Sequence, residues 1–160
     1  MVLAEILIVG MVATLAMDLW QRLLPSMTGR PLGGWAVVGR WVAGFRRGAF
    51  ISPSIAAEPS VRGELAIGWA FHYVVGFAYA AAYVALVEAH VVSPTFLSAI
   101  IFSLALLVAP WLVMQPALGQ GFLALRTPKP AVVRATNVSV HFVFGLGLYL
   151  GVVIWRTLSE

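Results

Sequence analysis

The sequence predicts an all-α, polytopic membrane protein with four transmembrane helices, and two observations carry this prediction. First, four apolar runs each span about 20 residues or more, which at about 1.5 Å per residue crosses a hydrocarbon core of roughly 30 Å. These runs are Val2 to Leu24, Leu65 to Val87, Thr95 to Met114 and Ala131 to Trp155. Second, 61% of the residues are hydrophobic and 10% are charged, whereas soluble domains carry about 25% charged residues. We therefore expect residues 1–160 to form a single four-helix transmembrane domain.

The distribution of basic residues predicts the orientation of the helices. Nine of the ten Lys and Arg residues lie in, or at the edges of, the first and third connections. The middle connection offers Glu88 and His90 instead. Because basic residues favour the cytoplasmic side of a membrane, both basic connections are expected in the cytoplasm and both termini on the opposite side. The basic residues in question are Arg22, Arg30, Arg40, Arg46, Arg47, Arg62, Arg126, Lys129 and Arg134.

The first connection, Pro25 to Glu64, is too long to be a turn and is expected to contain a short helix. Its apolar residues fall on one helical arc of roughly 120°, a pattern typical of a helix that lies in the cytoplasmic interface. These residues are Trp35, Val38, Trp41, Val42 and Phe45. We expect Arg40, Arg46 and Arg47 to act as orientation signals and to contact lipid headgroups. The indoles of Trp20, Trp35, Trp41 and Trp155 are expected in interfacial belts.

The third connection is expected to be irregular because it is rich in proline and glycine. It contains Pro116, Gly119, Gly121, Pro128 and Pro130. Two arrangements are open: an ordinary cytoplasmic loop, or a segment that folds back under the bundle. Just before it, Pro110 removes a backbone donor from the third helix and predicts a kink.

A local pattern shared by the second and fourth helices suggests a parallel 2+2 repeat. The segment from His72 to Phe77 can be laid over the segment from His141 to Leu146, which aligns a histidine, an aromatic residue and a glycine. Trp20 and Pro25 match Trp111 and Pro116 in the same way. Such a repeat would have its pseudo-twofold axis along the membrane normal.

Polar residues within the apolar runs predict a functional site. An ionisable group inside a span costs at least about 2.5 to 3.5 kcal/mol on insertion scales, so each one needs a partner or a purpose. Asp18, His72 and His141 all lie about 10 Å from the cytoplasmic ends of their runs, counted at helical rise from Leu24, Leu65 and Arg134. We therefore predict one polar cluster in the cytoplasmic half of the bundle. Its predicted members are Asp18, His72, Gln115, His141, Arg22 and Asn137.

Purely structural interpretations of these residues stay open. Asp18 and Arg22 are spaced for an i,i+4 ion pair, with Arg22 reaching toward the interface. Each histidine could donate an ordinary interhelical hydrogen bond, and Gly68, Gly76 and Gly145 suit close helix packing. A metal ion held by two histidines and a carboxylate is chemically reasonable, but the spacing does not select one.

Several classes of function are disfavoured. Cysteine is absent, which excludes disulfides and thiolate chemistry. No catalytic or phosphate-binding motif is recognisable, so an enzyme is the less favoured interpretation. The net charge is +4, and the basic residues that carry it lie beside the membrane spans. Anionic lipids rather than nucleic acid are therefore the expected partner.

Short motifs along nearly the whole chain resemble a bacterial family of small four-helix inner-membrane proteins known as a domain of unknown function. The motifs are Met17-Asp18-Leu19-Trp20, Gly39-Arg40-Trp41, Val61-Arg62-Gly63-Glu64, Gly68-Trp69 with His72-Tyr73, Met114-Gln115-Pro116, and His141 through Tyr149. The resemblance implies a four-helix, multi-pass protein of the bacterial inner membrane and supplies no reaction. In that membrane, the distribution of basic residues predicts periplasmic termini.

The polar cluster leads us to expect a small permease or an ion- or proton-coupled transport component with a cytoplasm-facing site. Histidine exchanges protons near neutral pH, which suits that role. The alternatives are a redox subunit in which His72 and His141 ligate one haem iron, and a non-catalytic assembly or accessory subunit of a membrane complex. Since four helices enclose little volume, we expect a homo-oligomer or a membrane partner subunit.

Overall fold

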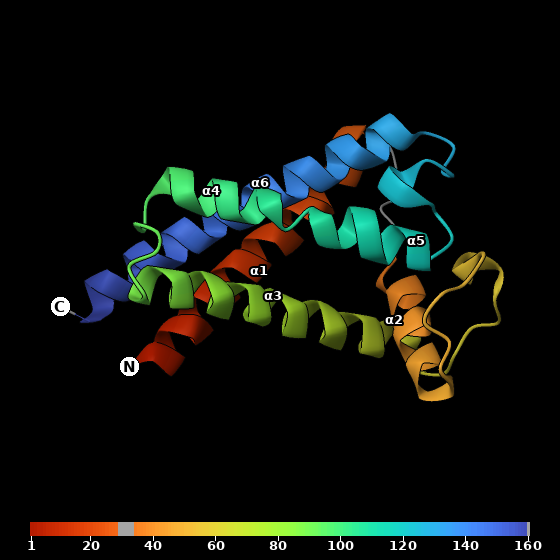
Figure 1. Ribbon diagram of the computed structural model, residues 1–160, viewed down its shortest axis with the longest axis horizontal. Helices are drawn as coiled ribbons and strands as arrows, with labels where there is room; N and C mark the ends of the chain where they lie inside the picture. Colours follow the sequence, from red (N-terminus) through yellow and green to blue (C-terminus); the bar gives the residue numbers. More distant parts are fainter. Residues whose placement is uncertain (29–33, 160) are drawn as a thin grey trace. The chain divides into compact units, whose positions relative to one another are not determined.

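The computed structural model describes residues 1–28 and 34–159, and all regular structure within these ranges is helical (Figure 1). The α-helices are α1 (Val2–Thr28), α2 (Trp35–Gly44), α3 (Glu64–Glu88), α4 (Phe96–Ala105), α5 (Gln115–Ala117) and α6 (Pro130–Ser159). Short 3-10 turns lie at Phe45–Arg47, Ile55–Ala57 and Phe122–Ala124, and a π-helical segment at Ala109–Met114. The predicted all-α fold is confirmed for the described residues, whereas Arg30 lies outside them.

Four helical segments are long and apolar enough to cross a membrane, as predicted. They are Val2–Met27, Glu64–Glu88, Phe96–Ala117 and Pro130–Ser159. Two ends differ from the sequence-based runs. Helix α1 continues through Pro25 to Thr28, because a proline forfeits one backbone hydrogen bond without ending the helix. Helix α6 begins at Pro130, where the missing N–H costs nothing. Both helices thus extend beyond Leu24 and Arg134, the residues from which the depths of Asp18 and His141 were counted.

Exposed apolar side chains recur along α1 every four residues and form a stripe that winds slowly around the helix. They are Leu3, Leu7, Met11, Leu15, Leu19, Leu23 and Met27. Val9 and Ala13, outside this stripe, are completely buried. A continuous exposed apolar stripe of this length is unfavourable in water and favourable against lipid, so the burial pattern agrees with a membrane span.

The third span is interrupted where Pro110 predicts a kink. Helix α4 starts with a capping box in which Thr95 and Ser98 exchange hydrogen bonds, and it ends at Ala105. After a turn at Leu106, the chain forms a π-helix at Ala109–Met114, and the third span ends with α5. The proline has no N–H to continue the α-helical pattern, and the chain widens around it.

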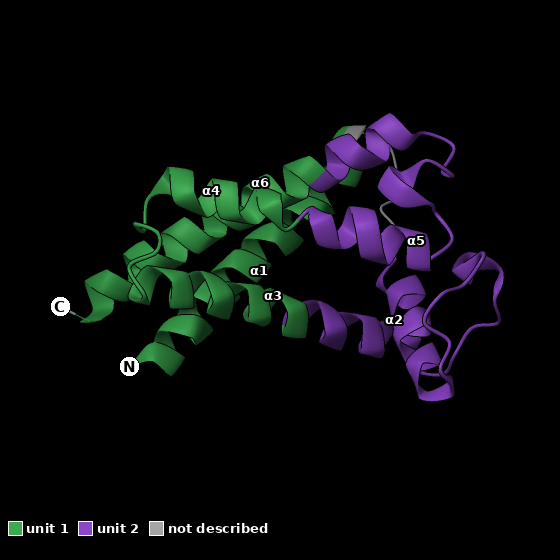
Figure 2. Cartoon of the chain, viewed as in Figure 1, with its two compact units in different colours: residues 1–31, 74–106, 138–160 green, residues 32–73, 107–137 purple. Residues whose placement is uncertain are grey.

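The chain divides into two compact units (Figure 2). Unit 1 comprises residues 1–31, 74–106 and 138–160, and unit 2 comprises residues 32–73 and 107–137. Helices α3 and α6 each contribute to both units. Neither unit coincides with one half of the sequence, so the parallel 2+2 repeat stays a prediction.

Glycines allow the helices of unit 1 to pack closely. A Cβ at Gly147 would lie 2.5 Å from the Ala13 Cα, and one at Gly151 would lie 2.7 Å from the Val9 Cα. These two contacts run in opposite directions along α1 and α6, which makes the helices antiparallel. Gly145 meets Ile100 of α4 in the same manner. Small residues at such positions let backbones approach and gain dispersion contacts.

In unit 2, helix α2 confirms the predicted helix of the first connection. Val38 and Trp41 are buried and pack with Ile55, Ala117 and Leu118 in one apolar cluster. The first and third connections are also joined through their backbones: the Ser52 N–H donates to the Ala117 carbonyl at 2.8 Å. Gly119, at φ +83°, lies against the Pro53 carbonyl where a side chain would not fit. The third connection is thus packed against the first.

Candidate functional site

Three polar side chains of unit 2 form a hydrogen-bonded cluster, which we call the amide cluster: Trp111, Gln115 and Asn137. The Trp111 Nε1–H donates to Asn137 Oδ1 at 3.2 Å, and the Gln115 Nε2–H donates to the same oxygen at 2.8 Å. Gln115 is only 2% exposed. The interrupted third span and α6 therefore meet through polar side chains within segments otherwise suited to lipid.

The hydrogen bonds of the amide cluster fix the orientation of both amides. An indole N–H can only donate, so Asn137 must present its oxygen to Trp111. Because that oxygen is also the acceptor for Gln115, Gln115 must offer its NH₂ group, which leaves Gln115 Oε1 on the other side. This oxygen is buried and has no hydrogen-bond partner. An unsatisfied buried acceptor costs about 1 to 3 kcal/mol, and such a group in a native protein needs an explanation.

The backbone around Gln115 departs from an α-helix. The Gln115 N–H bonds to the Pro110 carbonyl five residues earlier. Neither Pro110 nor Pro116 has an N–H of its own, so two positions of this short stretch provide no backbone donor. π-Helical turns occur frequently at functional sites, and interrupted helices with unwound carbonyls form the binding sites of many transporters. The unpartnered Gln115 Oε1 thus lies next to a π-helical segment, a type of element that is frequent at binding sites.

His72, also in unit 2, lies among aromatic rings. It is 4% exposed, and its ring centroid is 4.1 Å from that of Trp35 at an interplanar angle of 30°. The rings of Trp69 and Tyr73 approach it edge-on at 5.7 Å and 5.4 Å. Trp35 was expected in an interfacial belt, and the structure gives it this stacking contact in addition.

The remaining predicted site residues, Asp18, Arg22 and His141, belong to unit 1. Asp18 is buried and Arg22 is exposed. The ion pair that the structure shows in its described part is Arg40–Glu64, and the alternative Asp18–Arg22 pair stays a prediction. The His141 carbonyl accepts a hydrogen bond from Ser103 Oγ at 2.6 Å. The six predicted residues are therefore divided between the units, and their union in one cluster stays a prediction.

Some polar contacts were missed by the sequence analysis. Trp111 was considered only as a marker of the repeat, although it anchors Asn137. Trp20 was assigned to the interface, and its Nε1–H donates to Ser139 Oγ at 3.1 Å. Both indoles precede a proline by five residues, and both donate to a polar residue of α6. That common spacing was the available signal.

No metal site is evident in residues 1–28 and 34–159: no three His, Asp or Glu side chains there are close enough to hold an ion. The comparison with protein families gives one result. A family model described as "Protein of unknown function (DUF2938)" matches residues 7–155. The chain belongs to this family. The resemblance predicted from short motifs is thereby confirmed over almost the full length. No curated protein and no solved structure matches the chain.

Proposed function

We propose that this member of the DUF2938 family is a small permease or an ion- or proton-coupled transport component of the bacterial inner membrane. The observation that carries the proposal is the buried, unpartnered Gln115 Oε1 within an interrupted span. A purely structural amide pair would be expected to satisfy all of its donors and acceptors. An acceptor held open by fixed neighbours is instead suited to a ligand that supplies the missing donor.

Orientation follows from the basic residues of the sequence. With nine of the ten Lys and Arg residues at the first and third connections, both termini would be periplasmic. The amide cluster lies near the end of the third span that leads into the third connection. Its site would therefore open toward the cytoplasm. A second copy of the chain or a partner subunit would complete the pathway, since four helices enclose little volume.

Flux in proteoliposomes tests this proposal. The purified full-length protein would be reconstituted into phosphatidylethanolamine and phosphatidylglycerol vesicles loaded with pyranine. A potassium diffusion potential set by valinomycin then drives proton entry, and ²²Na⁺ uptake is measured in parallel. We expect flux of at least one ion above that of protein-free vesicles. Gln115→Leu should reduce it about tenfold, equivalent to roughly 1.4 kcal/mol of lost interaction.

The matched control is Gln120→Leu, the same substitution outside the membrane span. It should retain the wild-type flux. Absence of both proton and sodium flux in the wild-type protein would contradict the ion-coupled form of the proposal. Equal loss in both variants would show that the effect of Gln115→Leu is not specific to the amide cluster.

A further inference from the structure

Two arginines that follow helix α2 are available to bind a group outside the protein. Arg46 and Arg47 are exposed, and among the described residues neither makes a hydrogen bond or an ion pair. Arg40 was also expected to contact lipid headgroups, but its Nε lies 2.9 Å from Glu64 Oε2 and its side chain is only 12% exposed. Of these three arginines, Arg46 and Arg47 are therefore the ones that can reach a lipid phosphate.

Two large apolar side chains come directly after these arginines and are exposed as well. Phe50 is 59% exposed and Ile51 is 76% exposed, and both lie outside the four segments suited to cross a membrane. In contrast, Val38 and Trp41, on which the prediction of an interfacial helix rested, are buried in an apolar cluster of unit 2. The apolar side chains that this connection offers to a membrane surface thus belong to residues 46–51, which we call the arginine turn.

Hydrogen bonds hold the backbone of the arginine turn in place. The Gly48 N–H donates to the Phe45 carbonyl at 3.0 Å, and Gly48 adopts the left-handed conformation, at φ +71°, in which helices commonly end. The Trp41 Nε1–H donates to the Phe50 carbonyl at 2.8 Å. Because the turn is already formed, its backbone would lose little conformational freedom on binding a ligand.

No acidic residue within the arginine turn compensates its charge, since residues 46–51 include no Asp or Glu. The acids later in the same connection have other partners. Glu58 accepts a hydrogen bond from Ser52 Oγ, and Glu64 pairs with Arg40. The turn therefore presents two positive charges beside two apolar side chains, a combination typical of segments that bind the surface of an anionic membrane.

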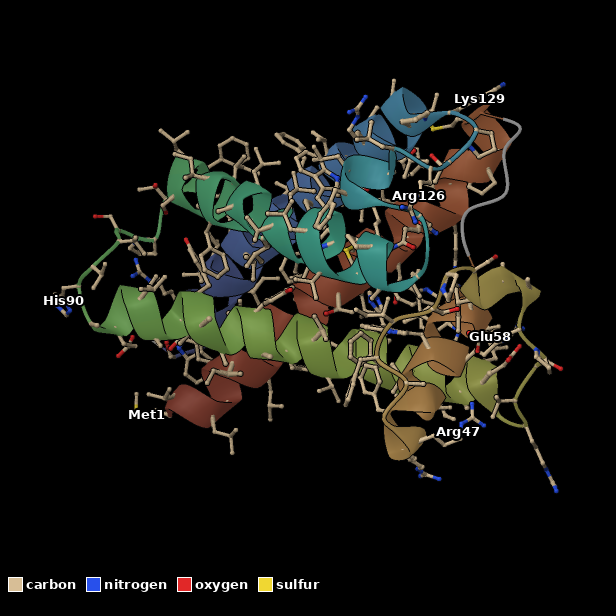
Figure 3. All side chains as sticks on the ribbon, turned by 45° about the vertical axis from the view of Figure 1, so that its right-hand side comes forward. Met1, Arg47, Glu58, His90, Arg126 and Lys129 are labelled. Carbon is tan, nitrogen blue, oxygen red and sulfur yellow. The ribbon has the colours of Figure 1, made fainter. Side chains whose placement is uncertain are left out.

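The third connection contains the same combination. Phe122 and Leu125 are 60% and 62% exposed, and Arg126 and Lys129, close by in the sequence, are exposed too (Figure 3). No Asp or Glu lies between Phe122 and Lys129. Because the basic residues predict both connections on the same side of the membrane, one anionic surface could contact both.

We propose that the arginine turn binds anionic phospholipid at the cytoplasmic surface of the membrane. Arg46 and Arg47 bind the phosphates of the headgroups. Phe50 and Ile51 insert at the boundary between headgroups and acyl chains. A zwitterionic lipid has no net charge and would offer chiefly the apolar contact, so the turn would bind it less tightly. This binding does not depend on transport by the protein.

A fluorescent probe in the turn tests the proposal. Because the chain has no cysteine, the exposed residue Ala49 can be labelled as Ala49→Cys while all four binding side chains are kept. The labelled full-length protein is placed in nanodiscs of phosphatidylcholine, alone or mixed equally with phosphatidylglycerol. Quenching is measured with doxyl-labelled lipid and with aqueous acrylamide. We expect phosphatidylglycerol to raise lipid quenching about twofold or more and to lower acrylamide quenching.

Variants in the labelled protein separate charge from apolar contact. Arg46→Gln combined with Arg47→Gln should remove the effect of phosphatidylglycerol, whereas the corresponding pair of lysine substitutions keeps the charge and should retain it. Phe50→Ser combined with Ile51→Ser should reduce lipid quenching in both kinds of nanodisc. The matched control is Arg62→Gln, which removes another exposed arginine of the same connection and should retain the effect.

The reference position is Ser60→Cys, an exposed site of the same connection outside the turn. Equal lipid quenching at position 49 in the two kinds of nanodisc would overturn the proposal, and so would acrylamide quenching as strong as at position 60. Protection from both quenchers would also overturn it, because protein rather than lipid would then cover the turn. Absence of ion flux would contradict the proposed transport and leave lipid binding by the turn standing.

Discussion

Arg40 and Glu64 form a two-point ion pair that ties α2 to the first turn of α3. The Arg40 Nε–H donates to Glu64 Oε2 at 2.9 Å and an Nη2–H donates to Oε1 at 3.0 Å. A third guanidinium nitrogen donates to the Glu58 carbonyl at 2.6 Å, and Glu64 also accepts from the Val61 N–H. The hydrogen bond with the carboxylate raises the pKa of Arg40, so the arginine stays charged.

This geometry predicts that Arg40→Lys lowers the Tm. An ammonium cannot donate in parallel to both carboxylate oxygens while also reaching the connection. Arg47→Lys is the control, because Arg47, which Figure 3 labels, is exposed. A double-mutant cycle of Arg40→Lys with Glu64→Gln, read by thermal unfolding, should be clearly non-additive. Additive effects would mean that the pair does not stabilise the docking of α2.

Substitution of the glycines where α2 meets α3 should also be destabilising. A Cβ at Gly39 would overlap the Glu64 carbonyl, and one at Gly68 would overlap the Trp35 carbonyl. Because these neighbours are backbone atoms, the helices would have to separate. We expect Gly39→Ala and Gly68→Ala each to cost at least about 1 to 3 kcal/mol of unfolding free energy.

The matched control for these two variants is Gly34→Ala. At Gly34 the nearest atom to an added Cβ would be 3.9 Å away, and the residue has an extended conformation with φ −76°. Its Tm should stay close to that of the wild type, because the smaller backbone entropy of the unfolded chain offsets the poorer N-cap propensity of alanine. A wild-type Tm in Gly68→Ala would contradict the close approach of the two helices.

Much of the fold was accessible from the sequence because lipid imposes simple rules on length and polarity. The four spans and α2 followed from apolar runs and helical periodicity. The ion pair between Arg40 and Glu64 could not be predicted in this way, because the two residues are 24 positions apart and no periodic pattern links them. The motifs Gly39-Arg40 and Arg62-Gly63-Glu64 marked both ends of the contact without joining them.

The candidate site could be predicted only in part from the sequence. Polarity within a span identified Gln115 and Asn137 individually, and the structure joins them. The unpartnered state of Gln115 Oε1 could not be predicted, because it depends on which amide atom faces Trp111.

The orientation of the membrane spans is directly testable with reporters. Fusions after Ser159 and insertions near His90 should report a periplasmic location, and an insertion near Gly48 a cytoplasmic one. His90 lies at the α3–α4 turn (Figure 3), where it is exposed and its Nδ1 contacts the Glu88 carbonyl oxygen at 2.8 Å, so an insertion there should disturb little packing. The readout is paired alkaline phosphatase and green fluorescent protein activity. A cytoplasmic signal from the His90 insertion would contradict the orientation, and the cytoplasm-facing site with it.

The amide cluster predicts opposite effects of one substitution on stability and on function. Gln115→Leu removes a hydrogen bond worth about 0.5 to 1.5 kcal/mol but also removes an unsatisfied acceptor that costs about 1 to 3 kcal/mol. Asn137 Oδ1 retains its bond from Trp111. We therefore expect an unchanged or higher Tm together with reduced flux, the combination typical of a residue kept for function at the expense of stability.

Trp111→Phe provides the comparison for Gln115→Leu. It removes the donor that fixes the orientation of Asn137, and it leaves every other member of the amide cluster in place. Its Tm should fall, because the partly buried Asn137 Oδ1 loses one of its two donors while Gln115 Oε1 stays unsatisfied. Thermal unfolding of the two variants under identical conditions gives the decisive comparison. A Gln115→Leu protein less stable than Trp111→Phe would indicate that Gln115 is a packing residue whose oxygen is satisfied in the membrane.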